Sequence, residues 1–94
     1  MLFMVIERFK NNDPEPVGER FRRQGRMLPD GVVYHASWID PVAARCFQLM
    51  EADDAARLED WAGRWADLAD FEIVPVLGSE DYWARLGTQK NRPG

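Results

Sequence analysis

Four segments of the chain are apolar at both alternating sets of positions, a pattern typical of strands with both faces covered. They are Leu2 to Phe9, Val32 to Ile39, Ala44 to Met50 and Phe71 to Leu77. Pro75 cannot donate to a strand ladder, so we expect the fourth strand at an edge of the sheet. The four residues between the second and third strands include Pro41 and predict a hairpin loop.

Two other segments repeat apolar residues at helical spacing. Asp13 and Pro14 suit the start of the first helix, and Gly25 suits its end. Asp53 is the expected cap of the second helix, which Asp70 ends. The apolar positions of that second helix are Leu58, Trp61, Ala62, Trp65 and Leu68.

The elements follow the order strand, helix, strand, strand, helix, strand, and then a short helix over residues 80–86 that Ser79 caps. This double βαβ order predicts an α+β, ferredoxin-like domain, in which two helices cover one face of a four-stranded antiparallel sheet. Residues 1–86 would form this single domain, and 87–94, which lack an apolar anchor, an unstructured tail. Because the second sheet face is apolar and has no helix to cover it, we expect a homodimer formed through that open face.

Composition limits the class of protein further. The chain has 94 residues, of which 46% are hydrophobic and 30% charged, as in a soluble globular domain. Its net charge of −4 argues against a nucleic-acid partner. No apolar run reaches membrane-spanning length, and the opening residues 1–6 follow no basic segment as a signal peptide would. Since Cys46 is the only cysteine, no internal disulfide can form, and we expect a cytoplasmic protein.

Charge is unevenly distributed along the chain. The first helical segment carries four arginines against two glutamates, and residues 51–70 carry seven acids against two arginines. If the two helices lie side by side, their surfaces are complementary, and the pairs they form contribute little stability when exposed to solvent. An anionic ligand on the arginines is the alternative interpretation.

The hairpin places several polar side chains in the middle of one sheet face. With a four-residue loop, we expect three cross-strand pairs: Ile39 with Ala44, Ser37 with Cys46, and His35 with Gln48. Directly paired residues share a face, so an imidazole, a hydroxyl, a thiol and an amide would meet there. A plain core has no need of such groups.

We therefore predict a ligand pocket on the open sheet face. His35 and Gln48 would orient a small apolar or aromatic ligand, with Ser37 and Cys46 in the wall, while Glu7 or Arg45 adds charge at the mouth. A loop of three or five residues would instead scatter these side chains over both faces.

Each of these residues also has an ordinary structural interpretation. A lone histidine on a strand commonly makes a structural hydrogen bond, which Gln48 would satisfy, and a strand cysteine is commonly a small buried hydrophobe. One histidine and one cysteine cannot complete a four-ligand zinc site within one chain, although a dimer could share one. No nucleotide-binding or nucleophile-elbow motif is present, so no cofactor is predicted.

Four sequence runs carry a family resemblance: residues 1–7 (MLFMVIE), 25–31 (GRMLPDG), 37–38 (SW) and 45–51 (RCFQLME). With them the chain resembles an uncharacterised family of small bacterial proteins known only as a domain of unknown function. More distantly, it is similar to the dimeric α/β-barrel group, which includes muconolactone isomerases and small cofactor-free monooxygenases. The resemblance implies a dimeric α/β barrel but assigns no catalytic residue, since fold alone does not convey function.

Three functions remain open at this stage. The first is a homodimeric protein that binds a small molecule in the predicted pocket. The second is a cofactor-free isomerase or monooxygenase in which His35 acts as the base. The third is a structural or regulatory dimerisation module whose open face is filled by its partner.

Overall fold

The computed structural model describes residues 1–87, which form a four-stranded antiparallel sheet and three α-helices. The strands are β1 (Leu2–Phe9), β2 (Val33–Asp40), β3 (Arg45–Glu51) and β4 (Ala69–Val76), in the order β2-β3-β1-β4. The helices are α1 (Glu15–Gln24), α2 (Ala55–Gly63) and α3 (Ser79–Gly87), with a short 3₁₀ helix η1 (Lys10–Asn12) after β1. The predicted α+β class, the order of elements and the edge position of the strand that contains Pro75 are confirmed.

Most of the expected ends of the helices lie close to those observed. Asp13 accepts the Glu15 N–H at the start of α1, and Gly25 ends that helix with a φ of 68°. Asp54, not Asp53, caps α2 by accepting the Arg57 N–H at 3.3 Å. Of the tail expected at 87–94, Gly87 is the last residue of α3, and the rest lies outside the described residues.

The second helix is shorter than expected, because α2 ends at Gly63 and not at Asp70. From there the backbone tightens into three-residue turns: the Trp65 N–H donates to the Ala62 carbonyl, and the Leu68 N–H to the Trp65 carbonyl. These turns continue the direction of the helix, and Trp65, four residues after Trp61, is buried as Trp61 is. The apolar spacing therefore predicted the burial correctly and the regular helix incorrectly.

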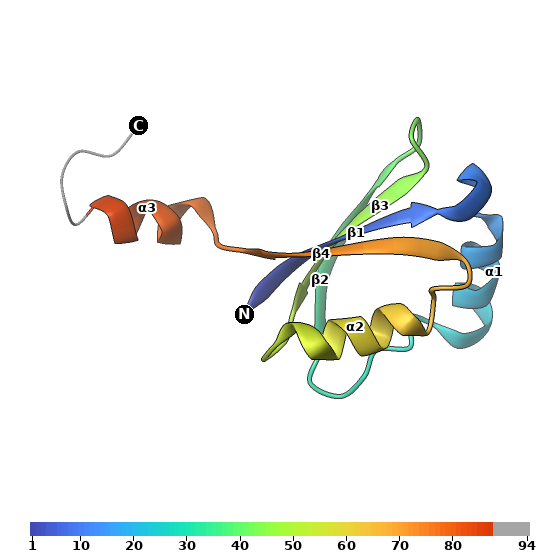
Figure 1. Ribbon diagram of the computed structural model, residues 1–94, viewed down its shortest axis with the longest axis horizontal. Coiled ribbons are helices and arrows are strands. Elements are labelled where there is room, and N and C mark those ends of the chain that lie inside the picture. The colour runs from blue at the N-terminus through green and yellow to red at the C-terminus, as the bar shows by residue number, and fades with distance from the viewer. Residues whose placement is uncertain (88–94) are drawn as a thin grey trace.

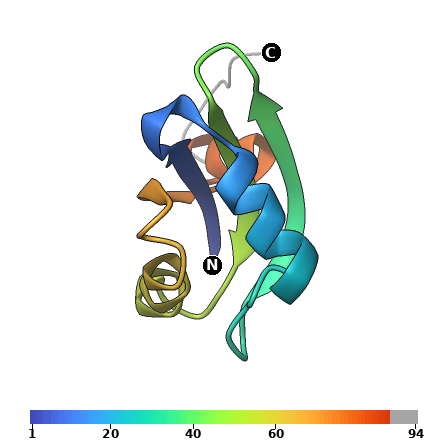
Figure 2. The same ribbon diagram turned by 90° about the vertical axis from the view of Figure 1, so that its right-hand side faces the viewer.

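Both α1 and α2 lie on the same side of the sheet (Figures 1 and 2). The core on that side combines sheet residues with apolar residues of α2 and its following turn, and α1 contributes only partly buried residues to its edge. Its fully packed members are Phe3, Val5, Val32, Met50, Ala52, Leu58, Trp61 and Trp65.

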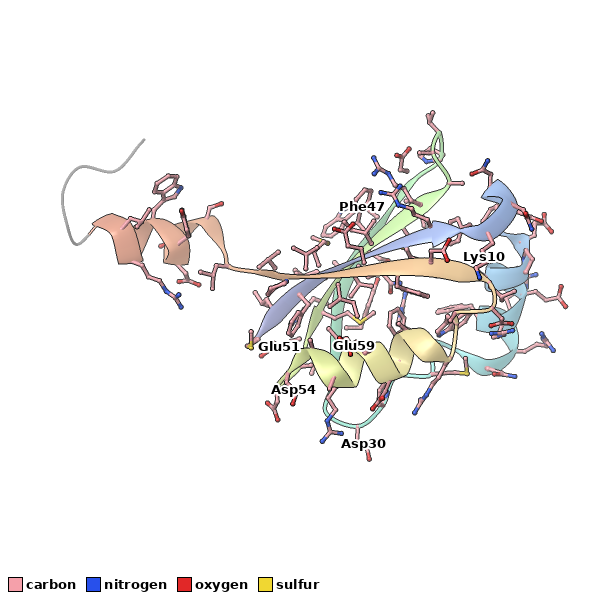
Figure 3. The ribbon with its side chains drawn as sticks, in the orientation of Figure 1. Lys10, Asp30, Phe47, Glu51, Asp54 and Glu59 are labelled. Atoms are coloured by element: carbon pink, nitrogen blue, oxygen red, sulfur yellow. The ribbon has the colours of Figure 1, made fainter. Side chains whose placement is uncertain are left out.

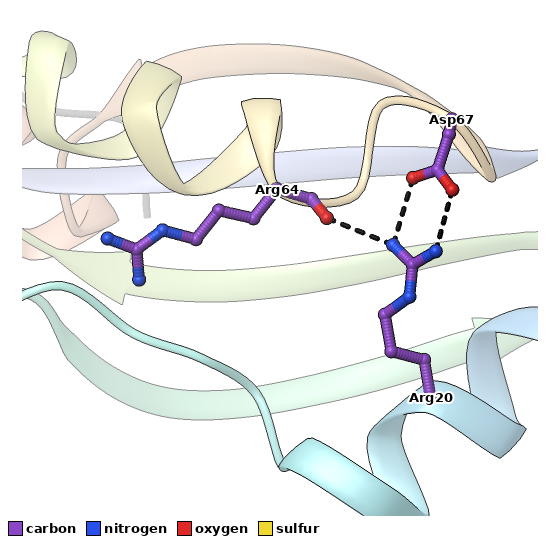
Figure 4. A network of polar contacts seen from close by, with 3 residues as sticks. All are labelled: Arg20, Arg64 and Asp67. Atoms are coloured by element: carbon purple, nitrogen blue, oxygen red, sulfur yellow. Dashed lines mark hydrogen bonds and ion pairs between the residues drawn. The ribbon is translucent and has the colours of Figure 1, made fainter.

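Helix α1 packs far less tightly against the sheet than α2 does. It has no buried residue, and its Phe21 is 44% exposed. An exposed bidentate pair holds it, in which the two terminal nitrogens of Arg20 contact the carboxylate of Asp67 at 2.9 and 2.6 Å; one also donates to the Arg64 carbonyl (Figure 4). This pair confirms that the basic helix meets the acidic segment, and an ion pair so exposed adds little to the stability of the fold.

The hairpin loop has four residues as predicted, but the strand pairing is displaced by two residues. Ser37 pairs with Gln48 and Ile39 with Cys46, so the expected pairs of Ile39 with Ala44, Ser37 with Cys46 and His35 with Gln48 are wrong. The Asp40 carboxylate explains the shift, because it accepts the Val42 and Ala43 N–H groups and the Arg45 Nε–H. These bonds place Asp40 opposite Arg45 at the end of the ladder and leave residues 41–44 as the loop.

The shift of two residues preserves which side chains share a face. Ser37, Cys46 and Gln48 do lie together, but they face α1 and α2 and not the open side. A β-bulge between Tyr34 and Ala36 displaces His35 from the ladder. The polar group predicted for the open face is thus divided, with its larger part beneath the helices.

The open sheet face combines apolar side chains with charged ones such as Arg45 and Glu72, and no helix covers it within residues 1–87. Trp38 is 55% exposed there, and Phe47 lies on the opposite side of the strands from α2 (Figure 3). Other apolar side chains that alternate onto this face include Met4, Ile6, Leu49 and Val74. The α3 helix, which has no buried residue, lies beyond the end of the sheet (Figure 1).

Candidate functional site

A cavity of about 310 Å³ lies between α1 and the helix-covered face of the sheet. The sheet contributes Glu7, Phe9, Ser37, Ile39, Cys46 and Gln48 to its walls, and Trp61 and Trp65 form a further wall. The opposite side consists of Pro14, Val17, Gly18 and Phe21 around α1, with Arg26 from the segment that follows. The cavity explains why α1 has no buried residue, since empty space separates part of it from the sheet.

The structure brings four of the six predicted site residues to this cavity. Glu7, Ser37, Cys46 and Gln48 line it, although on the face opposite to the one predicted. The prediction placed these residues on the wrong face of the sheet. The sequence shows which residues alternate together, but not which of the two sets the helices cover.

His35 and Arg45 lie outside the cavity. His35 is exposed at the bulge, where its Nε2 is 2.9 Å from the Glu51 Oε1. Arg45 donates to Asp40, and its guanidinium lies over the Phe47 ring on the open face. His35 therefore contacts a carboxylate at the surface and not the amide of Gln48.

A chain of hydrogen bonds runs along the sheet side of the cavity. The Arg26 Nε–H donates to the Gln48 Oε1 at 3.1 Å, and the Gln48 Nε2–H donates to the Glu7 Oε1 at 3.1 Å. Because a guanidinium can only donate, the amide of Gln48 has its oxygen toward Arg26 and its NH₂ toward Glu7. Glu7 and Gln48 are each 4% exposed and, among residues 1–87, are the two buried polar residues.

The ionisation of the buried groups follows from this arrangement. Burial raises the pKa of Glu7 above its ordinary value, and the Gln48 hydrogen bond, the Arg26 charge and the Cys46 thiol oppose that rise only in part. Burial, together with the nearby Glu7 carboxylate, raises the pKa of Cys46 to about 12. The thiol therefore stays protonated near neutral pH, which argues against a cysteine nucleophile.

Arg26 is the site residue that sequence reasoning missed, because it was grouped with the surface arginines of the first helix. It follows Gly25, so it does not continue the helix surface; its backbone carbonyl accepts the indole N–H groups of Trp61 (2.8 Å) and Trp65 (3.2 Å). Its guanidinium carbon lies 3.7 Å from the ring centroid of Tyr34. The predicted helix end at Gly25 was the one available signal that Arg26 turns inward.

Replacing Glu7 with glutamine tests the cost of the buried carboxylate. Because the folded state binds the Glu7 proton more tightly than the unfolded state, wild-type stability falls as the pH rises from 4.5 through the raised pKa. E7Q lacks this titrating group. Its free energy of unfolding, relative to that of wild type at the same pH, should therefore increase from pH 4 to pH 8. Urea unfolding of both proteins at these two pH values measures the difference, and an advantage that shrinks toward pH 8 would contradict the raised pKa.

Fold and site together define a small α+β domain with one open antiparallel sheet and a polar-edged cavity beneath its helices. Within residues 1–87 no group of three or more His, Cys, Asp or Glu side chains could hold a metal ion. Nor, in this part of the chain, is there a helix long and apolar enough to cross a membrane.

The chain belongs to the DUF3303 family, a domain of unknown function, which it matches over residues 1–90. The expected membership of an uncharacterised family of small domains is thereby confirmed. No curated protein and no solved structure matches the chain.

Proposed function

We propose that this protein binds a small, largely aromatic molecule in the cavity beneath α1. One observation carries the proposal: an apolar cavity has a buried, pre-oriented polar row along a single wall. Ligand sites commonly combine mainly apolar walls with a few convergent polar groups, and about 310 Å³ is near the lower end of their usual range of about 300–1,000 Å³. A compact molecule of one or two rings fits this description.

The side chains that line the cavity favour an aromatic ligand over an aliphatic one. Rings of Phe9, Phe21, Trp61 and Trp65 face the space, and aromatic rings pair favourably edge-to-face or offset. The polar row is ordered before any ligand arrives, because Arg26 fixes Gln48 and Gln48 contacts Glu7. A ligand that has an aromatic ring for these walls and a polar group for the ordered row loses little binding free energy to reorganisation of the site.

A cavity-filling substitution tests the binding site directly. Val17 lines the cavity from α1, so Val17→Trp should occupy the ligand space. A panel of aromatic ketones, phenols and hydroxy acids should include compounds that raise the melting temperature of wild type, since a ligand at 100 times its dissociation constant adds about 2.7 kcal/mol. V17W should lose these shifts, whereas Val42→Trp, at a hairpin position that is 94% exposed, should keep them. Shifts that persist in V17W would place binding elsewhere.

We also propose that the domain is ferredoxin-like and forms a homodimer through its open sheet face. The strand order, read as β4-β1-β3-β2 with all neighbours antiparallel, is the split βαβ arrangement in which each helix connects two parallel strands separated by a third. Support comes from the exposed Trp38 and the other apolar side chains that alternate onto this face, because exposed apolar groups in number mark interfaces. In such a pair α3 could lay its apolar side, which includes Tyr82 and Leu86, on the partner.

The dimer is also the basis of a second function, a structural or regulatory module without a ligand. That alternative follows if the open face associates and the cavity beneath α1 binds none of the compounds tested. A cytoplasmic location is our further proposal, because the single cysteine is a free thiol.

A further inference from the structure

A site that only binds an apolar ligand would not need both Glu7 and Arg26. A carboxylate buried in an apolar cavity is costly, and a neutral polar residue could accept the same Gln48 N–H. The guanidinium of Arg26 lies against the rings of Tyr34 and Phe21, and its one side-chain hydrogen bond within residues 1–87 is made by Nε to Gln48, so that its two terminal nitrogens make none. The cavity thus contains a proton acceptor and, at the other end of the Gln48 amide, unused cationic donors.

We propose that the cavity catalyses proton transfer on an aromatic ketone, with Glu7 as the base and Arg26 as the group that stabilises the developing oxyanion. This inference rests on the proposed ligand site and names the substrate class of that site. Its basis is the geometry: both groups line one cavity, and the Gln48 amide, bonded to each at 3.1 Å, fixes their separation.

The reaction needs no second reactant. The Glu7 carboxylate removes a hydrogen from the carbon next to the carbonyl as a proton, and the C–H electron pair forms a carbon–carbon double bond. The carbonyl π electrons move to oxygen, which becomes an enolate facing the Arg26 guanidinium. If the Glu7 carboxyl proton first exchanges with water, Glu7 returns a solvent-derived hydrogen to the same carbon, and the ketone has exchanged hydrogen with solvent. If Glu7 instead delivers the proton to the γ carbon of an unsaturated ketone, the product is an isomer.

The surroundings suit both roles. Desolvation makes a carboxylate a stronger base, and a base is most effective when its pKa lies near the working pH. A guanidinium beside apolar cavity walls stabilises a new negative charge more strongly than it does in bulk water. Gln48 is a positioning residue, since it touches both groups and holds their spacing.

The test is solvent-hydrogen exchange of 2-indanone, an aromatic ketone with acidic hydrogens beside its carbonyl. Exchange in D₂O is followed by proton NMR, and binding of the same compound is followed separately by quenching of the protein's tryptophan fluorescence, to which Trp61 and Trp65 in the cavity wall contribute. The variants are Glu7→Gln, Arg26→Met and, as a control, Glu59→Gln on the exposed surface of α2. Thermal unfolding establishes that each variant is folded.

The wild type should accelerate exchange over buffer, and E59Q should match it. E7Q should lower the rate constant at saturating ketone by at least about 100-fold, the usual contribution of a general base, while its dissociation constant stays within a few-fold of wild type. R26M should also lower the rate constant at saturation. Bound 2-indanone that does not exchange, or E7Q as fast as wild type, would overturn the catalytic inference and leave the binding site standing. If neither 2-indanone nor any other compound of the panel binds, the proposed function falls as well.

Discussion

Replacing Trp61 with alanine is expected to lower the free energy of unfolding by about 3–5 kcal/mol. Trp61 is 2% exposed, packs edge-on against Phe71 at 5.4 Å, and donates its indole N–H to the Arg26 carbonyl. The substitution removes a large apolar side chain next to an existing cavity and leaves that carbonyl with only the longer Trp65 bond. Urea unfolding at neutral pH measures the loss.

The conservative variant Trp61→Phe separates packing from hydrogen bonding. It keeps most of the apolar volume and loses the indole donor, so the expected loss is about 1–3 kcal/mol, clearly smaller than for alanine. Equal losses in the two variants would mean that the hydrogen bond to Arg26 dominates. A loss below about 1 kcal/mol in W61A would contradict the position of Trp61 in the core.

Trp38→Glu is expected to convert the proposed dimer to a monomer at micromolar concentration. Trp38 is half exposed on the open face, and replacing it with glutamate removes its apolar contact area and adds a charge that must be desolvated on association. Loss of an interface tryptophan that carries much of the binding energy costs about 2 kcal/mol or more, and 2 kcal/mol is about a 30-fold weaker dimer. Sedimentation equilibrium or light scattering measures the change.

Val42→Glu is the matched control for this experiment. Val42 is 94% exposed at the tip of the β2-β3 hairpin, so the same new charge there should leave the dimer intact. Circular dichroism should show that both variants are folded. A wild type that is monomeric at micromolar concentration, or a W38E protein that stays dimeric, would exclude the open face as the interface.

Periodicity in the sequence was sufficient for the elements and insufficient for their exact pairing. The apolar spacing through Trp61 and Trp65 correctly predicted two core residues, even though the helix ends at Gly63 between them. The hairpin pairing depended on bonds that the Asp40 carboxylate makes to the loop, and side-chain acceptance of this kind is not a periodic signal. The bulge that displaces His35 is likewise local.

The candidate site was predicted in part for a physical reason. A displacement of two residues does not change which side chains share a face, so Ser37, Cys46 and Gln48 stayed together despite the wrong pairing. Which face the helices cover depends on connections between elements, and alternation carries no information about it. Arg26 could not be chosen over its neighbouring arginines, because its inward direction depends on the backbone after Gly25.

The cavity has one well-packed wall, formed by the sheet and α2, and one loosely packed wall, formed by α1. Opening the cavity from the α1 side requires the loss of the exposed Arg20 contacts with Asp67 and the Arg64 carbonyl and of the partly buried Val17, but of no fully buried side chain. Opening of this helix can therefore be a local event that leaves the sheet and α2 folded. A protein built in this way can exchange the contents of its interior without unfolding.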